Sequence, residues 1–168
     1  MAAAYSLDQW IWTHADFERM GWHDATVHAM GYASATEWEF ALDIDYILAW
    51  VQPAPGQEHF TFWIAPATLI FEHVSDLRID AEPRGEISVQ DLRCDDEQPL
   101  RPGFDGPPSD WRWTLDCNEG EISMRATGFR QIFRRPPVHR DHQKLALDDR
   151  GGISFSETPP ASPALGTR

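Results

Sequence analysis

The sequence predicts an α+β domain, in which an N-terminal helical segment packs on a twisted, mainly antiparallel β-meander sheet curled into a half-barrel or split sandwich. Apolar residues recur with the period of a helix before residue 21 and with the two-residue period of a strand from about residue 25. Short turn-rich connections separate the later segments, which favours antiparallel neighbours over a βαβ fold. We expect residues 1–156 to form one domain and residues 157–168, rich in Pro, Ala, Ser and Thr, to be a disordered tail.

The helix is expected over residues 6–21. Ser6 with Gln9 has the spacing of a capping box, and Thr13 with Asp16 could begin a second helical turn. Gly21 is a natural C-terminal stop. An apolar stripe at helical spacing supports this prediction, and consists of Leu7, Trp10, Ile11, His14 and Phe17.

Strands are expected over nine later segments of alternating character. Three of their connections, at residues 52–57, 83–85 and 118–120, have the Gly, Pro or Asn composition of hairpin turns. Residues 95–110 are expected to form a long exposed loop, and residues 151–155 a closing strand. Pro66 and Ser75 are expected to interrupt the long apolar run that contains them. The nine segments are 25–32, 37–51, 58–65, 67–74, 76–82, 86–94, 110–117, 121–127 and 129–135.

The segment 37–51 alternates more regularly than any other part of the chain. Its aromatic and aliphatic residues share one parity, while Glu37, Glu39, Asp43 and Asp45 share the other. A strand directs these two sets to opposite faces, so we expect one buried apolar face and one anionic surface. The side chains predicted to be buried are Trp38, Phe40, Leu42, Ile44, Tyr46, Leu48, Trp50, Leu69, Phe71, Trp111 and Trp113.

The chain is strongly acidic, with a formal net charge of −13 and no lysine or arginine between Arg19 and Arg78. This balance argues against nucleic-acid binding, which needs a clustered cationic surface. No apolar run is long enough for a transmembrane helix, and the N-terminus lacks the features of a secretory signal. Cys94 and Cys117 are too few for a disulfide framework or a zinc site. We therefore expect a cytoplasmic protein that binds neither nucleic acid nor membranes.

The most suggestive short motif is Gly21-Trp22-His23-Asp24, at the join between the expected helix and the first strand. A histidine beside a carboxylate at a chain bend can act as a general base, a metal ligand or a partner contact. It can equally form a structural corner in which Asp24 caps a turn and Trp22 packs beneath it. We favour the structural corner and keep His23 and Asp24 as candidate binding residues.

Asp43 and Asp45 are the other candidate binding residues. Together with Glu72 and either His23 or His28 they would suit a hard cation such as calcium or magnesium. No established metal-binding spacing supports this hypothesis, so we predict no metal and no cofactor. Motifs for a serine nucleophile or a phosphate loop are also absent. A late basic cluster, which either pairs with the acidic face of residues 37–45 or binds an anion, consists of Arg125, Arg130, Arg134, Arg135, Arg140 and Lys144.

Several landmarks resemble those of a family of small uncharacterised bacterial proteins. They are Trp22-His23-Asp24, the run Leu42-Asp43-Ile44-Asp45-Tyr46-Ile47 with Trp50, Pro66–Phe71, and Arg150-Gly151-Gly152-Ile153-Ser154-Phe155. The resemblance covers residues 15–156 and implies no activity, cofactor or site. By class analogy, small acidic domains also resemble immunity proteins of bacterial toxin systems.

The composition and the missing catalytic motifs favour a non-enzymatic binding protein, such as an immunity-type domain, with a basic protein as its partner. The alternative is a metal-dependent enzyme or a small-ligand-binding protein that uses Trp22-His23-Asp24 with Asp43 or Asp45. Whether the protein is an enzyme is left open by the sequence.

Overall fold

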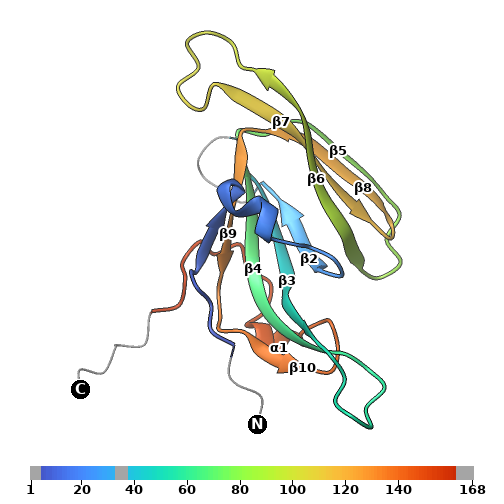
Figure 1. Cartoon of the computed structure of the whole chain (residues 1–168). Helices are drawn as coiled ribbons and strands as arrows, with labels where there is room; N and C mark the ends of the chain where they lie inside the picture. Colours follow the sequence, from blue (N-terminus) through green and yellow to red (C-terminus); the bar gives the residue numbers. More distant parts are fainter. Residues whose placement is uncertain (1–4, 33–37, 162–168) are drawn as a thin grey trace, which may run out of the picture.

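The computed structural model describes residues 5–32 and 38–161. It is built almost entirely of antiparallel strands, with 51% of the described residues in strands and 7% in helices (Figure 1). The helical elements are the 3₁₀ helix η1 (His14–Arg19) and the single-turn helix α1 (Leu147–Arg150). The strands are β1 (Ile11–Thr13), β2 (Thr26–Gly31), β3 (Phe40–Val51), β4 (Thr61–Glu72), β5 (Ser75–Ala81), β6 (Ile87–Pro99), β7 (Ser109–Cys117), β8 (Gly120–Ala126), β9 (Gly128–Phe133) and β10 (Val138–Arg140).

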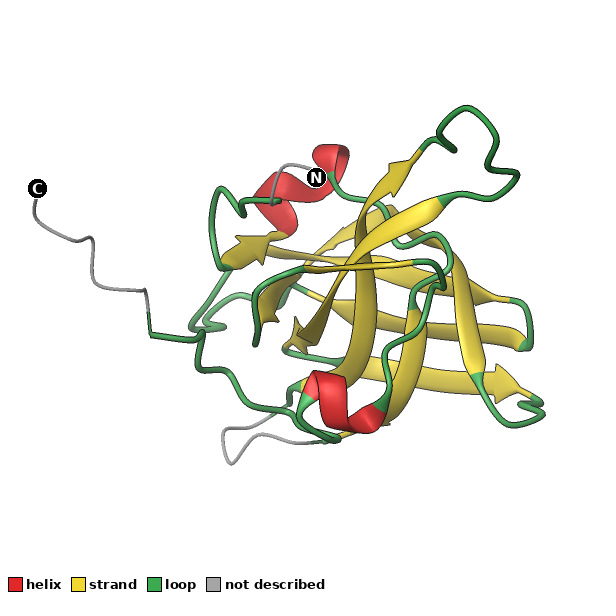
Figure 2. Ribbon diagram, turned by 90° about the horizontal axis from the view of Figure 1, so that it is seen from below, coloured by secondary structure: helices red, strands yellow, loops and turns green. Residues whose placement is uncertain are grey.

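The strands form one sheet in the order β1-β9-β4-β3-β2-β6-β7-β8-β5, with β10 paired to the end of β4. The sheet folds over itself into two layers, one made of β5 to β8 and the other of the remaining strands (Figures 1 and 2). The chain passes between the layers where β4 leads into β5 and where β8 leads into β9. The architecture is therefore all-β.

The main hydrophobic core lies between the two layers. Leu42, Ile44 and Phe71 of one layer belong to the same buried cluster as Trp113 and Leu115 of the other. Aromatic rings meet edge-on at its centre, with 5.3 Å between the ring centroids of Trp113 and Phe129. Because each buried aromatic side chain removes roughly 150–250 Å² from water, this cluster is a major source of stability.

The predicted α+β class with an N-terminal helix over residues 6–21 is wrong. Residues Ile11–Thr13 instead form the edge strand β1, which pairs with Arg130–Ile132 of β9. The Thr13–Asp16 capping box is present, but it starts only the six-residue η1. Ile, Trp and Thr prefer strands to helices. These residues therefore pair with the free edge of β9 as a strand, although their apolar spacing also fits a helix. Phe17 of η1 still packs on the core, stacked on Trp22.

Most of the predicted strands agree with the structure to within a few residues, and β6 has a register shift between Val89 and Asp91. The hairpins at residues 52–57 and 118–120 are also confirmed. The prediction of a hairpin at residues 83–85 is wrong, because β5 pairs with β8 rather than with β6. The expected loop 95–110 is shorter, since β6 continues to Pro99 and β7 begins at Ser109.

Pro66 does not interrupt its strand. It pairs with Asp45 of β3 inside the continuous strand β4, and its carbonyl accepts a hydrogen bond from the Arg134 backbone N–H. Along that edge of β4, β9 pairs up to Ala67 and β10 begins only at Ile64. Proline lacks an N–H, and here that group would point into the gap between the two neighbouring strands.

The predicted apolar face of β3 is confirmed for Phe40, Leu42, Ile44 and Tyr46, which are all buried. The prediction is wrong for Trp38 and Trp50, which are 65% and 42% exposed. Trp38 precedes the strand and has a φ of 71°. Trp50 follows a register shift between Ile47 and Ala49, which changes the phase of the alternation. Of the other predicted core residues, Leu69, Phe71 and Trp113 are buried, while Leu48 and Trp111 are half-buried.

The second face of β3 is buried as well. The C-terminal segment after β9, which contains β10 and α1, crosses this face (Figure 1). It adds two small apolar clusters, one with Leu145 against Ile47 and Ile64, the other with Phe155 beside Ala41 and Ile70. Between these clusters lie Asp43 and Asp45, so the expected anionic surface is an interior. Glu37 of that predicted surface, and residues 162–168 of the predicted tail, lie outside the described residues.

Candidate functional site

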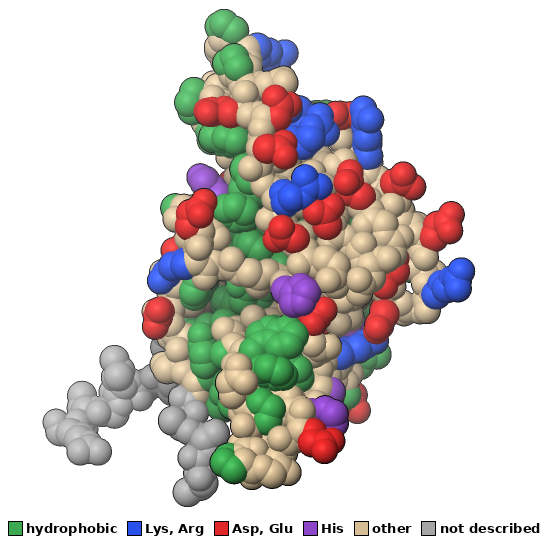
Figure 3. All heavy atoms as spheres, turned by 45° about the vertical axis from the view of Figure 1, so that its right-hand side comes forward, with side chains coloured by type: hydrophobic (Ala, Val, Ile, Leu, Met, Phe, Trp, Pro, Cys, Tyr) green, Lys and Arg blue, Asp and Glu red, His purple; other side chains and the backbone are tan. Residues whose placement is uncertain are grey.

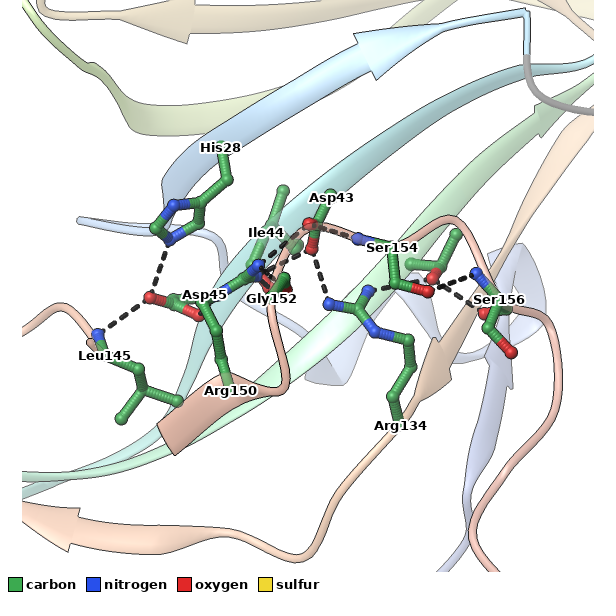
Figure 4. A network of polar contacts seen from close by, with 11 residues as sticks. His28, Asp43, Ile44, Asp45, Arg134, Leu145, Arg150, Gly152, Ser154 and Ser156 are labelled. Carbon is green, nitrogen blue, oxygen red and sulfur yellow. Dashed lines mark hydrogen bonds and ion pairs between the residues drawn. The ribbon is translucent and has the colours of Figure 1, made fainter. Parts of the chain in front are cut away.

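Asp43 and Asp45 are completely buried between β3 and the C-terminal segment, with 0% of either residue exposed (Figure 4). Their two positions on one strand face direct both carboxylates toward the same covering segment. A buried carboxylate is costly unless cations and hydrogen-bond donors surround it. The structure supplies both.

Arg150 is the centre of this arrangement. Its Nη1 and Nη2 donate to the two oxygens of Asp43 at 2.8 and 2.6 Å, and its Nε donates to Asp45 Oδ1 at 3.0 Å. The two remaining N–H groups meet the carbonyls of Gly152 at 2.7 Å and Ile44 at 3.3 Å. A guanidinium has five N–H donors, and all five of these are used. This explains how an arginine side chain can be wholly buried here.

Arg134 and two backbone amides complete the network. Arg134 Nη2 donates to Asp43 Oδ1 at 2.6 Å, while its Nη1 donates to the Thr68 hydroxyl. The Ser154 N–H donates to Asp43 at 2.9 Å, and the Leu145 N–H donates to Asp45 at 2.8 Å. The two aspartates therefore bind the C-terminal segment at positions before and after α1.

His28 closes the network on the side of β2. Its Nε2 lies 2.8 Å from Asp45 Oδ2, and only 9% of its side chain is exposed. Two carboxylates thus face two guanidinium groups and one imidazole. Hydrogen bonds of this charge-assisted kind are shorter and stronger than neutral ones. The cluster is internally neutralised.

Two glycines allow Arg150 to reach inward. Gly151 has a φ of 78° and ends α1 in the left-handed region, and Gly152 has the same φ. A β-carbon is strained at this φ, so glycine suits both positions. The resulting turn brings the chain back toward β3, where the Ser154 N–H donates to Asp43. The predicted strand over residues 151–155 is therefore wrong, because this segment bonds to side chains instead of to a strand.

The network lowers the pKa of both aspartates. Burial alone would raise the pKa of Asp43, but the hydrogen bonds from Arg150 and Ser154 and the charge of Arg134 outweigh it. Burial is also the largest influence on Asp45, where His28, Leu145 and Arg150 reverse it and lower the pKa. Both groups are therefore ionised in the folded protein near neutral pH.

His23 and Asp24 form a corner on the surface, separate from the charge network. Asp24 has a φ of 61°, and its N–H donates to the Val89 carbonyl at 2.8 Å. Its carboxylate accepts a hydrogen bond of 2.7 Å from Gln143. His23 Nδ1 lies 3.1 Å from the Gln90 carbonyl, and the His23 ring stacks on Trp50.

Trp22 lies beneath this corner, fully buried, and its Nε1 donates to Gln131 at 2.9 Å. The corner joins β2, β6 and the C-terminal segment. The four candidate binding residues thus fall into two places, and no hydrogen bond or ion pair joins His23 or Asp24 to Asp43 or Asp45. In the described parts of the chain, no three His, Cys, Asp or Glu side chains are grouped so that they could hold a metal ion.

The basic cluster is divided among several carboxylates. Arg130 pairs with Glu39, Glu72 and Glu157, and Arg134 pairs with Asp43, so the predicted pairing with the acidic face is confirmed for these two arginines. Arg125 lies elsewhere and pairs with Asp96 and Asp110. Arg140 pairs with Asp149 and Lys144 with Glu86.

Sequence reasoning missed the role of Arg150. Arg150 stood outside the predicted basic cluster, and the two glycines after it were the sequence feature that could have indicated its role.

Burial raises the pKa of the thiols of Cys94 and Cys117 to about 11, which disfavours either as a nucleophile.

Two of the surface clefts lie near residues discussed above. One of about 360 Å³ lies beside the corner and is lined by Trp50, Phe60, His142 and Gln143. Another of about 450 Å³ lies between η1 and β6.

Comparison with known protein families, curated proteins and solved structures finds no match for this chain. The resemblance to a family of small bacterial proteins therefore stays a prediction. In the described residues, no helix has the length and apolar character needed to cross a membrane.

Replacing Asp43 by Asn should lower the free energy of unfolding by about 3–5 kcal/mol, because it leaves the buried Arg134 guanidinium without its carboxylate and Arg150 with Asp45 alone. The contribution of Asp43 to the free energy of unfolding should be fully present above the unfolded-state pKa of 3.8. It should be lost progressively as the pH falls below that value, because the folded-state pKa of Asp43 is lower. The variant should show a shallower loss of stability in that acid range. Urea unfolding at a series of pH values measures both effects.

Glu86→Gln is the matched control, because Glu86 belongs to an exposed ion pair with Lys144. It should change stability by less than about 1 kcal/mol. An Asp43→Asn variant as stable as the wild type would contradict the structural role and favour a functional carboxylate.

Replacing Asp24 by Ala should cost about 1–2 kcal/mol, because Gln143 loses its acceptor while the backbone keeps its left-handed φ. Asp24→Asn should lie closer to the wild type, since it keeps an acceptor and tolerates this φ. Urea melts of both variants measure the difference. An unchanged midpoint for Asp24→Ala would mean that the corner serves a ligand rather than the fold.

Proposed function

We propose that this chain is a non-enzymatic binding protein whose partner is a basic protein, as an immunity-type domain would be. The observation that carries the proposal is the distribution of charge. Residues 75–126, which contain β5 to β8, hold thirteen carboxylates and six arginines. The excess charge of the molecule is therefore concentrated in one layer of the sheet.

Part of this charge has no internal counter-ion. Asp76, Asp110 and Asp116 pair with arginines of the same layer. Among the described residues, six further exposed carboxylates of residues 75–126 make no ion pair, namely Asp80, Glu82, Asp91, Asp95, Glu97 and Asp105. Acidic side chains, with some basic ones among them, are spread over the upper half of the surface in Figure 3, where this layer lies.

The proposed binding surface is therefore the β5–β8 layer, and not the anionic surface that the sequence predicted at residues 37–45. Asp43 and Asp45 are neutralised by Arg134 and Arg150, and Glu39 pairs with Arg130. A partner cannot reach the two aspartates without displacing the C-terminal segment. Complementary charge between exposed surfaces accelerates association and makes it sensitive to salt.

The proposal predicts salt-sensitive capture of a basic protein from an extract of the native cell by the immobilised chain. A variant with four carboxylates of the β5–β8 layer converted to amides should capture at least about tenfold less, since close charge pairs contribute about 1.5 kcal/mol or more each. Quantitative mass spectrometry of the eluates at low and high salt measures this. The substitutions are Asp80→Asn, Glu82→Gln, Asp91→Asn and Asp95→Asn.

The control has the same net charge as the test variant but a different charge distribution. Its four substitutions, outside the β5–β8 layer, are Asp8→Asn, Glu58→Gln, Asp141→Asn and Asp148→Asn. This variant should capture the partner nearly as well as the wild type. Capture that is independent of salt, or that is lost equally in both variants, would count against a partner bound through the β5–β8 layer.

A further inference from the structure

The two edges of strand β6 are paired with neighbouring strands over different lengths. Along one edge it pairs with β7 from Val89 to Pro99. Along the other it pairs with β2 only at Ile87 and Ser88, and the Ala25 carbonyl accepts from the Val89 N–H. Gln90 offers its carbonyl to His23. Past Gln90, within the described residues, this edge of β6 forms no backbone hydrogen bond.

An open edge of this kind is a template for another strand. In an antiparallel pair the residues alternate between those bonded to the partner strand and those whose N–H and C=O point the other way. About half of the backbone groups of residues 91–95 therefore face away from β7. Natural proteins usually cover or charge such edges to prevent unwanted pairing.

The open edge borders the cleft between η1 and β6. Phe17, Met20 and Trp22 line this cleft on one side, and Leu92 and Cys94 line it on the other. Leu92 and Trp22 are buried, whereas Phe17, Met20 and Cys94 are half-buried. The cleft therefore offers apolar contacts directly beside unpaired backbone groups.

The rim of the same cleft is acidic. Glu18, Asp91 and Asp95 line it, are exposed, and form no ion pair within the described residues. The single cation of the cleft is Arg93, and its guanidinium is held by Asp116 at 2.6 Å. On β6, Asp91 and Asp95 alternate with Leu92 and Cys94 and so point to the opposite face.

We propose that the open edge of β6 over Asp91–Asp95 receives an extended segment of the basic partner as an added antiparallel or parallel strand. The inference rests on the proposed function and specifies its binding mode. Cross-strand neighbours of opposite charge stabilise a sheet, so basic side chains of the segment lie opposite Asp91 and Asp95. Its alternate apolar side chains enter the cleft beside Phe17 and Met20. Strand addition gains affinity from main-chain hydrogen bonds and specificity from alternate side chains.

The test uses a short capped synthetic peptide in which lysine and valine alternate, added to the full chain labelled with ¹⁵N. We expect saturable binding, with slower hydrogen exchange at alternate amides of residues 91–95. Two control peptides are a lysine–valine peptide with its lysines and valines in separate blocks and an alternating glutamate–valine peptide. Both should bind at least about fivefold more weakly, since two cross-strand charge pairs contribute about 1 kcal/mol or more together.

A charge-reversed variant, Asp91→Lys with Asp95→Lys, should bind the alternating peptide about tenfold more weakly than the wild type. Asp80→Lys with Asp105→Lys is its control and should bind nearly as well as the wild type. Thermal melts confirm that both variants are folded, as expected for exposed positions.

Absence of peptide binding, or protection of amides elsewhere, would overturn the strand-addition proposal. So would concentration-dependent protection of residues 91–95 without peptide, which would mean that two copies of the chain pair through this edge. Salt-sensitive capture of a basic protein would stand in each of these cases, so failure of the binding mode is distinguishable from failure of the proposed function.

Discussion

The fold depends on the neutralisation of two buried carboxylates on β3, an interior strand of the sheet. Asp43 and Asp45 occupy alternate positions of β3, which has strands on both sides and protein on both faces. Such a position admits a charge only with a complete set of partners, and these come from Arg134, Arg150 and two amides of the C-terminal segment. The segment is therefore attached through polar bonds that require one register, whereas apolar contacts alone would tolerate several.

The sequence predicted the strands and the inner face of β3 because alternation is a local property. Phe40, Leu42 and Ile44 needed only the parity rule. The same rule cannot say whether the opposite face meets solvent or another segment, and Asp43 and Asp45 look identical in both cases. Their partner Arg150 lies more than a hundred positions away, so its role depends on tertiary structure. The N-terminal error has a similar origin, because Ile11–Thr13 becomes a strand only when the edge of β9 is present.

Internal neutralisation also determines where function can reside. Arg130 of β9 and two arginines after β9, Arg134 and Arg150, neutralise Glu39, Asp43 and Asp45, which leaves the β5–β8 layer with the surplus of negative charge. The His23–Asp24 corner lies where β2 meets β6 and adjoins the point at which β6 loses its neighbour. The function that we propose would therefore place structural and binding roles on different strands, with buried charge in the framework and exposed charge toward the partner.

Native-state hydrogen exchange of the Leu145 and Ser154 amides tests the central claim most directly. Each donates to one of the buried aspartates, so neither can exchange while the charge network is intact. If the network attaches the C-terminal segment as an integral part of the fold, both amides exchange only with global unfolding, at the free energy measured for the β3 amides of Leu42 and Ile44. Exchange at a much lower free energy, with β3 still protected, would show that the segment opens locally and would contradict the account.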